Sequence, residues 1–212
     1  MFKIIVLILC IFFVESICFT TFLYSQVRCP ELNDTSINKI DAANLKQGIW
    51  KYFYPDDCKL HVVEYYKDGK KNGIFSYYKH DGLLISEVPY VNDTIKGLAK
   101  YYYSWGPVIC YEIEYNHGIL NGETRNFSIK GKLLTKTNYS NGVKNGQEVT
   151  YYDNGCKMME TAYKNGKENG SRIIYNKGRS NRKIREYIFE DDIRVKTIYY
   201  KNSGKIKKIT IP

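Results

Sequence analysis

Apolar and aromatic residues recur in short stretches of about eight positions from Gly48 to the end of the chain, and Gly, Asn or Asp separates the stretches. Residues 73–79 read Gly-Ile-Phe-Ser-Tyr-Tyr-Lys, and residues 83–90 follow after a glycine turn. Stretches of this length and composition predict β-strands joined as hairpins. No stretch of about 11 or more residues has apolar positions at helical spacing. The only helix expected is one short turn within residues 31–47.

These strand pairs form an internal repeat of about 24 residues. A glycine opens each unit, and an aromatic ring stands five positions later in every full unit. The final half unit has Val195 in place of the glycine and Gly204 at its turn. A fixed period of this length is typical of stacked repeats. We therefore expect an all-β fold, an elongated single-layer antiparallel sheet of about six and a half hairpins, or about 13 strands. The opening glycines are Gly48, Gly73, Gly97, Gly122, Gly146 and Gly170, and the rings are Phe53, Tyr78, Tyr102, Phe127, Tyr151, Tyr175 and, in the half unit, Tyr200.

A tyrosine and a second turn mark the end of each unit. The turns include Asp68-Gly69, Asn141-Gly142 and Asn165-Gly166, and such pairs supply the positive φ that two-residue hairpin turns require. The glycine is missing at Asn92-Asp93 and at Glu190-Asp191, where the sequence departs from the pattern. The tyrosines stand about seventeen positions after each opening glycine, at Tyr65, Tyr90, Tyr115, Tyr139, Tyr163 and Tyr187.

Rings also stand on either side of the repeat ring, as at Tyr77 and Tyr101 before it and at Tyr54 and Tyr103 after it. Neighbouring strand positions point to opposite faces of a sheet, so both faces carry rings, as suits a sheet with no second layer. The rings have two interpretations. They are either the core of a thin fold, with each hydroxyl left in water, or an aromatic binding surface. We expect the repeat rings to be structural.

Residues 141–155, Asn-Gly-Val-Lys-Asn-Gly-Gln-Glu-Val-Thr-Tyr-Tyr-Asp-Asn-Gly, followed by Tyr-Lys-Asn-Gly at residues 163–166, resemble the MORN-variant repeat. This repeat occurs in bacterial proteins often labelled YwqK-type antitoxins. The resemblance extends roughly from Gly48 to Gly204. It implies a stack of hairpins that binds proteins or, as in related eukaryotic repeats, phospholipid headgroups. It also implies a partner toxin, but it assigns a function to no individual residue.

The first 25 residues predict a signal peptide. Lys3 is followed by an unbroken apolar run from Ile4 to Val14, which is too short to span a bilayer but fits the core of an export signal. The alternative is an uncleaved membrane anchor over residues 2–24. Residues 26–47 are then a leader or cap, and residues 48–212 are the repeat domain. We expect an exported protein that is periplasmic, on the outer surface or secreted, with membrane anchoring as the alternative.

Four cysteines follow the predicted signal peptide, at Cys29, Cys58, Cys110 and Cys156. In a linear stack the last three are separated from one another by roughly 19 to 38 Å, whereas a disulfide needs Cα atoms within about 7 Å. Only a Cys29–Cys58 bridge is feasible, and it would tie the leader to the first hairpin. We expect Cys110 and Cys156 to be free or to bridge chains.

The excess positive charge is concentrated at the C-terminal end. The chain has a formal net charge of +10, and residues 164–212 carry 14 Lys and Arg against 5 Asp and Glu. This end is a candidate contact for an anionic surface, such as lipid headgroups, lipopolysaccharide phosphates or an acidic partner. Alternatively, lysines on a final edge strand protect an open edge from aggregation. No nucleic-acid recognition motif is present. The candidate contacts are Arg182, Lys183, Arg185, Lys201, Lys205, Lys207 and Lys208.

The sequence has no motif for catalysis or metal binding. It lacks a phosphate-binding GxxxxGK loop, HExxH and Cys-x-x-Cys, and His61, His80 and His117 do not stand at ligand spacing from a cysteine. We therefore expect no enzyme activity, cofactor, metal or small-molecule substrate. The predicted function is a non-catalytic scaffold for protein–protein interaction at the cell envelope. The alternatives are a binder of anionic lipid and a YwqK-type antitoxin.

Overall fold

The computed structural model describes residues 29, 34–178 and 181–212. The predicted signal peptide and anchor lie outside these residues. Within the described part, no helix is long and apolar enough to cross a membrane. The described strands are β1 (Lys39–Ile40), β2 (Lys46–Phe53), β3 (Leu60–Lys67), β4 (Lys70–Lys71), β5 (Gly73–Tyr78), β6 (Leu84–Val91), β7 (Thr94–Ile95), β8 (Gly97–Tyr102), β9 (Ile109–Asn116), β10 (Ile119–Phe127), β11 (Leu133–Ser140), β12 (Val143–Tyr151), β13 (Lys157–Lys164), β14 (Lys167–Tyr175), β15 (Lys183–Glu190), β16 (Ile193–Tyr200) and β17 (Ile206–Thr210).

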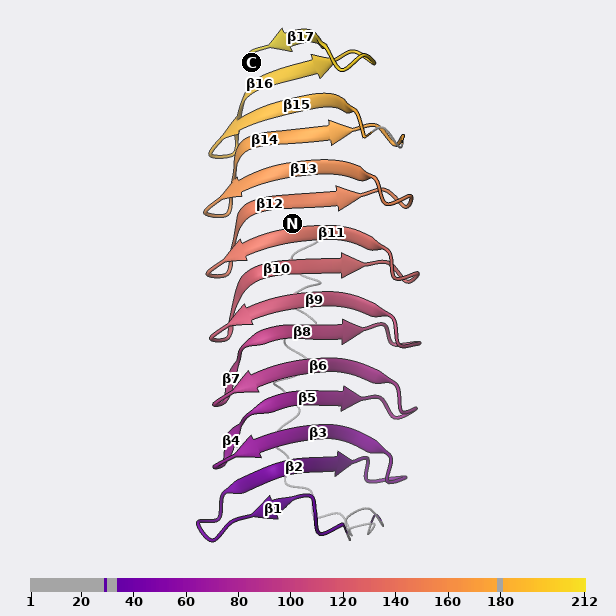
Figure 1. The fold of residues 1–212 in the computed structure, drawn as a ribbon, viewed down its shortest axis with the longest axis vertical. Helices are drawn as coiled ribbons and strands as arrows, with labels where there is room; N and C mark the ends of the chain where they lie inside the picture. The colour runs from indigo at the N-terminus through magenta and orange to yellow at the C-terminus, as the bar shows by residue number, and fades with distance from the viewer. Residues whose placement is uncertain (1–28, 30–33, 179–180) are drawn as a thin grey trace.

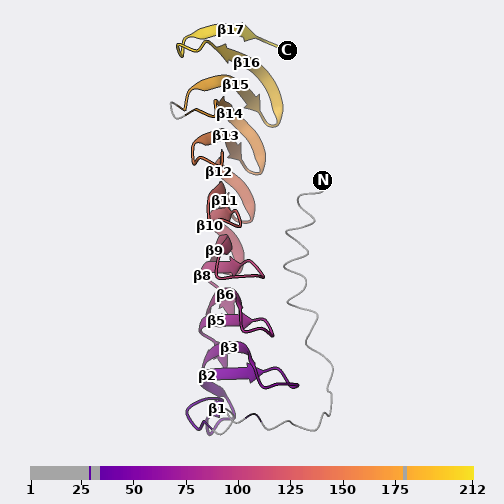
Figure 2. The same ribbon diagram turned by 90° about the vertical axis from the view of Figure 1, so that its right-hand side faces the viewer.

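These strands form one open antiparallel sheet in which strands pair in the order of the chain, apart from the short β4 and β7 (Figure 1). The hairpin tips line one side of the column, and the turns between units line the other (Figure 1). Turned by 90°, the described strands make a narrow single layer (Figure 2). The predicted elongated sheet of stacked hairpins is confirmed.

The described residues form 17 strands where the sequence predicts about 13. Part of the difference is that two long strands are each split in two. β3 pairs with both β4 and β5, and β6 pairs with both β7 and β8. Each split lies immediately before an opening glycine, where the backbone leaves the regular ladder. In β10 the corresponding irregularity shifts the register between Leu120 and Thr124 but leaves a single strand.

The opening glycines have positive φ, and at all of them except Gly48 the backbone also passes close to a side chain of the preceding strand. Gly73 has φ 135°, and a Cβ built on it would lie 2.7 Å from the Cβ of Tyr65. Gly122 has φ 121°, and its Cβ would lie 2.9 Å from the Cγ of Glu114. A side chain would be both strained and obstructed at these positions.

Each opening glycine pairs across its hairpin with a ring. Gly73 pairs with Tyr90, and Gly122 pairs with Tyr139. The first and last full units pair their glycine with a different ring. Gly48 pairs with Tyr66 rather than Tyr65, and Gly170 pairs with Phe189 rather than Tyr187. The difference follows the number of residues between the paired strand ends at the tip, which is five between β5 and β6, six between β2 and β3 and seven between β14 and β15.

Aspartates replace glycine in the two turns that depart from the repeat. Asp93 has φ 65°, and its N–H donates to the carbonyl of Lys71 at 3.0 Å. The Asp93 carboxylate in turn accepts the Lys71 N–H at 2.8 Å. Asp192 makes the same two bonds to Glu168, at 2.9 and 2.7 Å. An aspartate tolerates the left-handed conformation and adds a hydrogen bond between units that glycine cannot make.

One face of the sheet, which we call the core face, carries a ladder of buried side chains. It includes Phe75 opposite Val88 and Ala99 opposite Ile113, and Phe75 and Ala99 are 0% exposed. Farther along, the ladder becomes polar and includes buried Thr137 and Thr161. The opposite face, the charged face, carries a ladder that runs through Glu87, Lys100, Glu112, Arg125 and Lys136.

The expected helical turn within residues 31–47 is wrong for the described residues 34–47. The carboxylate of Asp41 accepts the N–H groups of Ala43 and Leu45, and Asn44 has φ 61°. These bonds close a tight turn between β1 and β2, which pair antiparallel. A local aspartate turn therefore satisfies the backbone groups that a helical turn would otherwise pair.

Candidate interaction surface at the open sheet edge

The first edge of the sheet is closed by the segment before β2. The side chain of Asn38 accepts the Lys51 N–H at 2.8 Å and donates to the Lys51 carbonyl at 3.3 Å. A Cys29–Cys58 disulfide, with a Cα–Cα distance of 5.3 Å, ties the leader to the first hairpin tip. This is the bridge that the repeat spacing predicts. Polar groups at the outer side of β2 are thus partly paired within the chain.

The last edge is open. β17 pairs with β16, and no described strand lies on its other side (Figure 1). Ile206 is 53% exposed and Ile209 is 47% exposed. They lie opposite Tyr200 and Ile198, which are on the charged face, whereas Lys208 lies opposite Tyr199 on the core face. β17 therefore offers an unpaired backbone with apolar side chains on one face and a lysine on the other.

Three of the seven basic candidates make contacts within the sheet. Arg182 donates to the carbonyl of Asn202 at 2.7 Å. Lys183 lies 3.4 Å from the carboxylate of Glu186. The guanidinium of Arg185 donates to the Tyr187 hydroxyl at 2.9 Å and lies 4.9 Å from the ring centre of Tyr199. These contacts connect β15 to β16 and to the following turn, which assigns the three side chains a structural role.

The other four candidates surround β17. Lys201 and Lys205 lie in the tip before it, and Lys207 and Lys208 lie in the strand itself. All four are exposed, and within the described residues none of them pairs with a carboxylate. Their charge is therefore available to an approaching molecule. It also discourages a second basic edge from pairing with this one.

The repeat rings are half-buried or buried between strands, in agreement with the structural interpretation. On the charged face, the Tyr102 hydroxyl donates to Glu87 at 2.7 Å, and the Tyr200 hydroxyl donates to Glu186 at 2.5 Å. Burial, and then the hydrogen bond to the carboxylate, raise the pKa of Tyr102 to about 12. The same causes raise the pKa of Tyr200 to about 12. The phenols therefore remain protonated donors at neutral pH.

The other two cysteines after the leader are not joined to each other. Cys110 lies in β9, and Cys156 lies in the turn between β12 and β13. β10, β11 and β12 separate the two positions, as expected for a linear stack.

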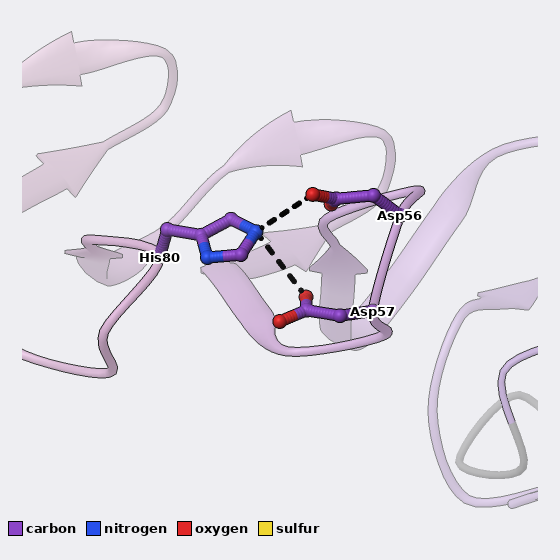
Figure 3. Close-up of side chains that lie close together, drawn as sticks. All are labelled: Asp56, Asp57 and His80. Atoms are coloured by element: carbon purple, nitrogen blue, oxygen red, sulfur yellow. Dashed lines mark hydrogen bonds and ion pairs between the residues drawn. The ribbon is translucent and has the colours of Figure 1, made fainter.

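A cluster at the first two hairpin tips was missed by the sequence reasoning. The Nε2 atom of His80 lies 2.9 Å from a carboxylate oxygen of Asp56 and 3.4 Å from one of Asp57 (Figure 3). The signal is the repeat itself, because Asp56 and His80 are 24 residues apart and so occupy equivalent tips of adjacent units.

Comparison with models of known protein families found no match for the chain. Comparison with curated proteins also found no match. Functional proposals therefore rest on the open edge, the basic residues around it and the cluster at the first tips.

Proposed function

We propose that the chain is a non-catalytic repeat scaffold that binds another protein through the open edge of β17. The observation that carries the proposal is the asymmetry of the two edges. Asn38 and β1 cover the first edge, whereas β17 leaves its outer backbone groups and two isoleucines exposed. An exposed edge strand can bind an extended peptide as an additional strand through backbone hydrogen bonds.

The side chains of β17 suggest the chemistry of this partner. An added strand would place one set of its side chains beside Ile206 and Ile209 and the alternate set beside Lys208, because successive residues face opposite sides. A segment that alternates apolar and acidic residues fits both faces. Antiparallel pairing centred on Lys208 of two copies would instead set lysine directly against lysine, and this repulsion is destabilising.

Binding of a partner at β17 is tested by affinity capture. Three forms of the full chain are used in turn to capture proteins from an envelope extract. We expect the wild-type protein and the control Ile193→Lys to capture the same partner in stoichiometric amount. The double variant Ile206→Lys/Ile209→Lys should lose it. Ile193 is a suitable control because it is 68% exposed but lies in β16. Hydrogen exchange should also slow at residues 206–210 in the complex. If all three forms capture the partner equally, or if hydrogen exchange in β17 is unchanged in the complex, β17 is excluded as the binding site.

A second candidate function is binding of an anionic membrane surface. It is favoured by the four exposed lysines around β17, because each lysine near an anionic surface contributes about 1 kcal/mol. Co-sedimentation with phosphatidylglycerol vesicles should fall with added salt. It should also fall when Lys201, Lys205, Lys207 and Lys208 are changed to Gln. Salt-independent sedimentation, or the same sedimentation for the quadruple variant, would argue against it.

The resemblance to MORN-variant repeats supports a more specific version of the protein-binding proposal, in which the partner is a toxin. Capture of a toxic protein on the wild-type edge, with relief of its toxicity on co-expression, would support an antitoxin role. Capture of a partner that is not toxic would be consistent with the scaffold function and would exclude the antitoxin role.

A further inference from the structure

The tips of the first two hairpins bring together three side chains that commonly bind metals. We propose that Asp56, Asp57 and His80 bind a divalent transition metal ion of the zinc type. This site lies at the opposite end of the sheet from β17, and it does not depend on the scaffold function.

The three side chains converge although they come from different units. Asp56 and Asp57 lie in the tip between β2 and β3, and His80 lies in the tip between β5 and β6. One potential ligand atom from each residue lies within 4.8 Å of the other two. Figure 3 shows the two carboxylates approaching the same imidazole nitrogen of His80. Only small side-chain movements would be needed to place one cation among the three atoms.

The hydrogen-bond inventory of the cluster favours a cation. Nε2 of His80 carries at most one hydrogen. Two carboxylates approach this nitrogen, so they must share a single donor. The ammonium group of Lys59 forms an ion pair with the Asp57 carboxylate at 2.8 Å. The Asp56 carboxylate contacts Nε2 of His80. A divalent ion would serve as the common partner of both carboxylates and of the imidazole, whose nitrogen would then act as an acceptor.

The surrounding structure orders both tips. Cys58, next to Asp57, is held by the disulfide to Cys29, and its N–H donates to the Tyr54 carbonyl at 3.0 Å. The ring of Tyr54 lies 4.7 Å from the ring of His80. The side chains of His80 and Asp56 are 47% and 66% exposed. The cluster is therefore supported by its neighbours and remains accessible from solvent to a metal ion and its water molecules.

The ligand types select the class of metal. An imidazole nitrogen with two carboxylate oxygens suits zinc and the neighbouring transition metals. Calcium is coordinated by six to eight oxygen ligands, and this cluster offers a nitrogen and few oxygens. Three protein ligands leave the remaining position of a four-coordinate zinc site to water.

Zinc binding is tested by calorimetric titration of zinc chloride into the full chain. We expect one zinc ion per chain. His80→Asn and Asp56→Asn should each weaken binding by at least about tenfold, the lower end of the effects seen even for residues behind metal ligands. The matched control is His117→Asn, because His117 is another exposed turn histidine and asparagine tolerates its φ of 50°. This variant should bind zinc like the wild type, as should Cys156→Ser.

Three results would contradict the proposed zinc site. They are an unchanged zinc affinity in both cluster variants, a loss of zinc binding in Cys156→Ser, and calcium binding as tight as zinc binding. Circular dichroism checks that each variant is folded, and the two cluster variants provide independent tests if one is not. Ile206→Lys/Ile209→Lys should bind zinc normally, so failure of the β17 proposal and failure of the metal site can be told apart.

Discussion

The hydroxyl of Tyr102 donates a 2.7 Å hydrogen bond to the carboxylate of Glu87, which lies 15 residues earlier. The same relationship joins Tyr175 to Glu160 in a later unit. The repeat ring thus crosses from the first strand of one unit to a glutamate in the second strand of the preceding unit. Its apolar ring covers the neighbouring strand, and its hydroxyl donates a hydrogen bond to the glutamate carboxylate.

Tyr102→Phe is expected to destabilise the sheet by about 1 kcal/mol, because it leaves a half-buried carboxylate without a donor. The matched variant is Phe127→Tyr, at the same position of the next unit. It should be nearly neutral, because Glu112, the carboxylate in the corresponding place, is already paired with Arg125 at 3.0 Å. Urea unfolding followed by circular dichroism measures both changes. An equal loss of stability in the two variants would contradict this role of the hydroxyl.

Alkaline pH should destabilise the fold in a defined window. The pKa of Tyr102 and that of Tyr200 are raised to about 12 in the folded chain, against about 10 for an unperturbed tyrosine. The protonated phenol is thus favoured by folding. Its contribution is fully present below about pH 10 and is lost as pH rises through about 12. Ultraviolet titration of wild type and Tyr102→Phe, together with unfolding at each pH, measures the effect. A flat stability between pH 10 and 12 would exclude it.

The period and the turn chemistry made most of the fold predictable from sequence. Gly73 and Tyr102 occupy repeat positions with local requirements, a bulged backbone and a ring over the preceding unit, and a glycine and a ring return at these positions in every full unit. The pairing of Gly48 with Tyr66 depends instead on the length of the tip, because six residues lie between the paired ends of β2 and β3 and five between those of β5 and β6. A fixed spacing from the opening glycine therefore does not specify the cross-strand register in every unit.

The candidate sites were less predictable for a similar reason. The basic residues were visible as composition, but only three-dimensional contacts separate Arg182 and Arg185, which bind within the sheet, from Lys207 and Lys208 on the open edge. His80 looks like any polar turn residue until its tip is superimposed on the preceding one. Stacking brings residues one period apart into contact.

Replacement of an opening glycine should cost far more than replacement of a tip glycine. In Gly73→Ala the new Cβ would lie 2.7 Å from the Cβ of Tyr65, whereas Gly82, with φ 85°, has no atom within 4 Å of that position. Gly82→Ala therefore carries only the cost of a left-handed alanine, about 1 kcal/mol. Gly73→Ala must in addition displace β3, and we expect at least about 3 kcal/mol, as for severe overpacking. Paired denaturant titrations distinguish the two, and equal losses would contradict the close-approach argument.

Loss of the Cys29–Cys58 disulfide should loosen the first edge of the sheet without unfolding the last. The bridge closes a loop over a sequence separation of 29, and a loop of this size contributes about 3.6 kcal/mol in the chain-entropy description. A repeat sheet is stabilised mainly between neighbours, so hydrogen exchange in Cys29→Ser should quicken in β1–β3 and stay unchanged in β14–β17. Cys156→Ser, which removes a cysteine outside this disulfide, should leave both regions as they are. Uniformly faster exchange along the column in Cys29→Ser would show instead that the sheet unfolds as one cooperative unit, in which the first edge secures every hairpin.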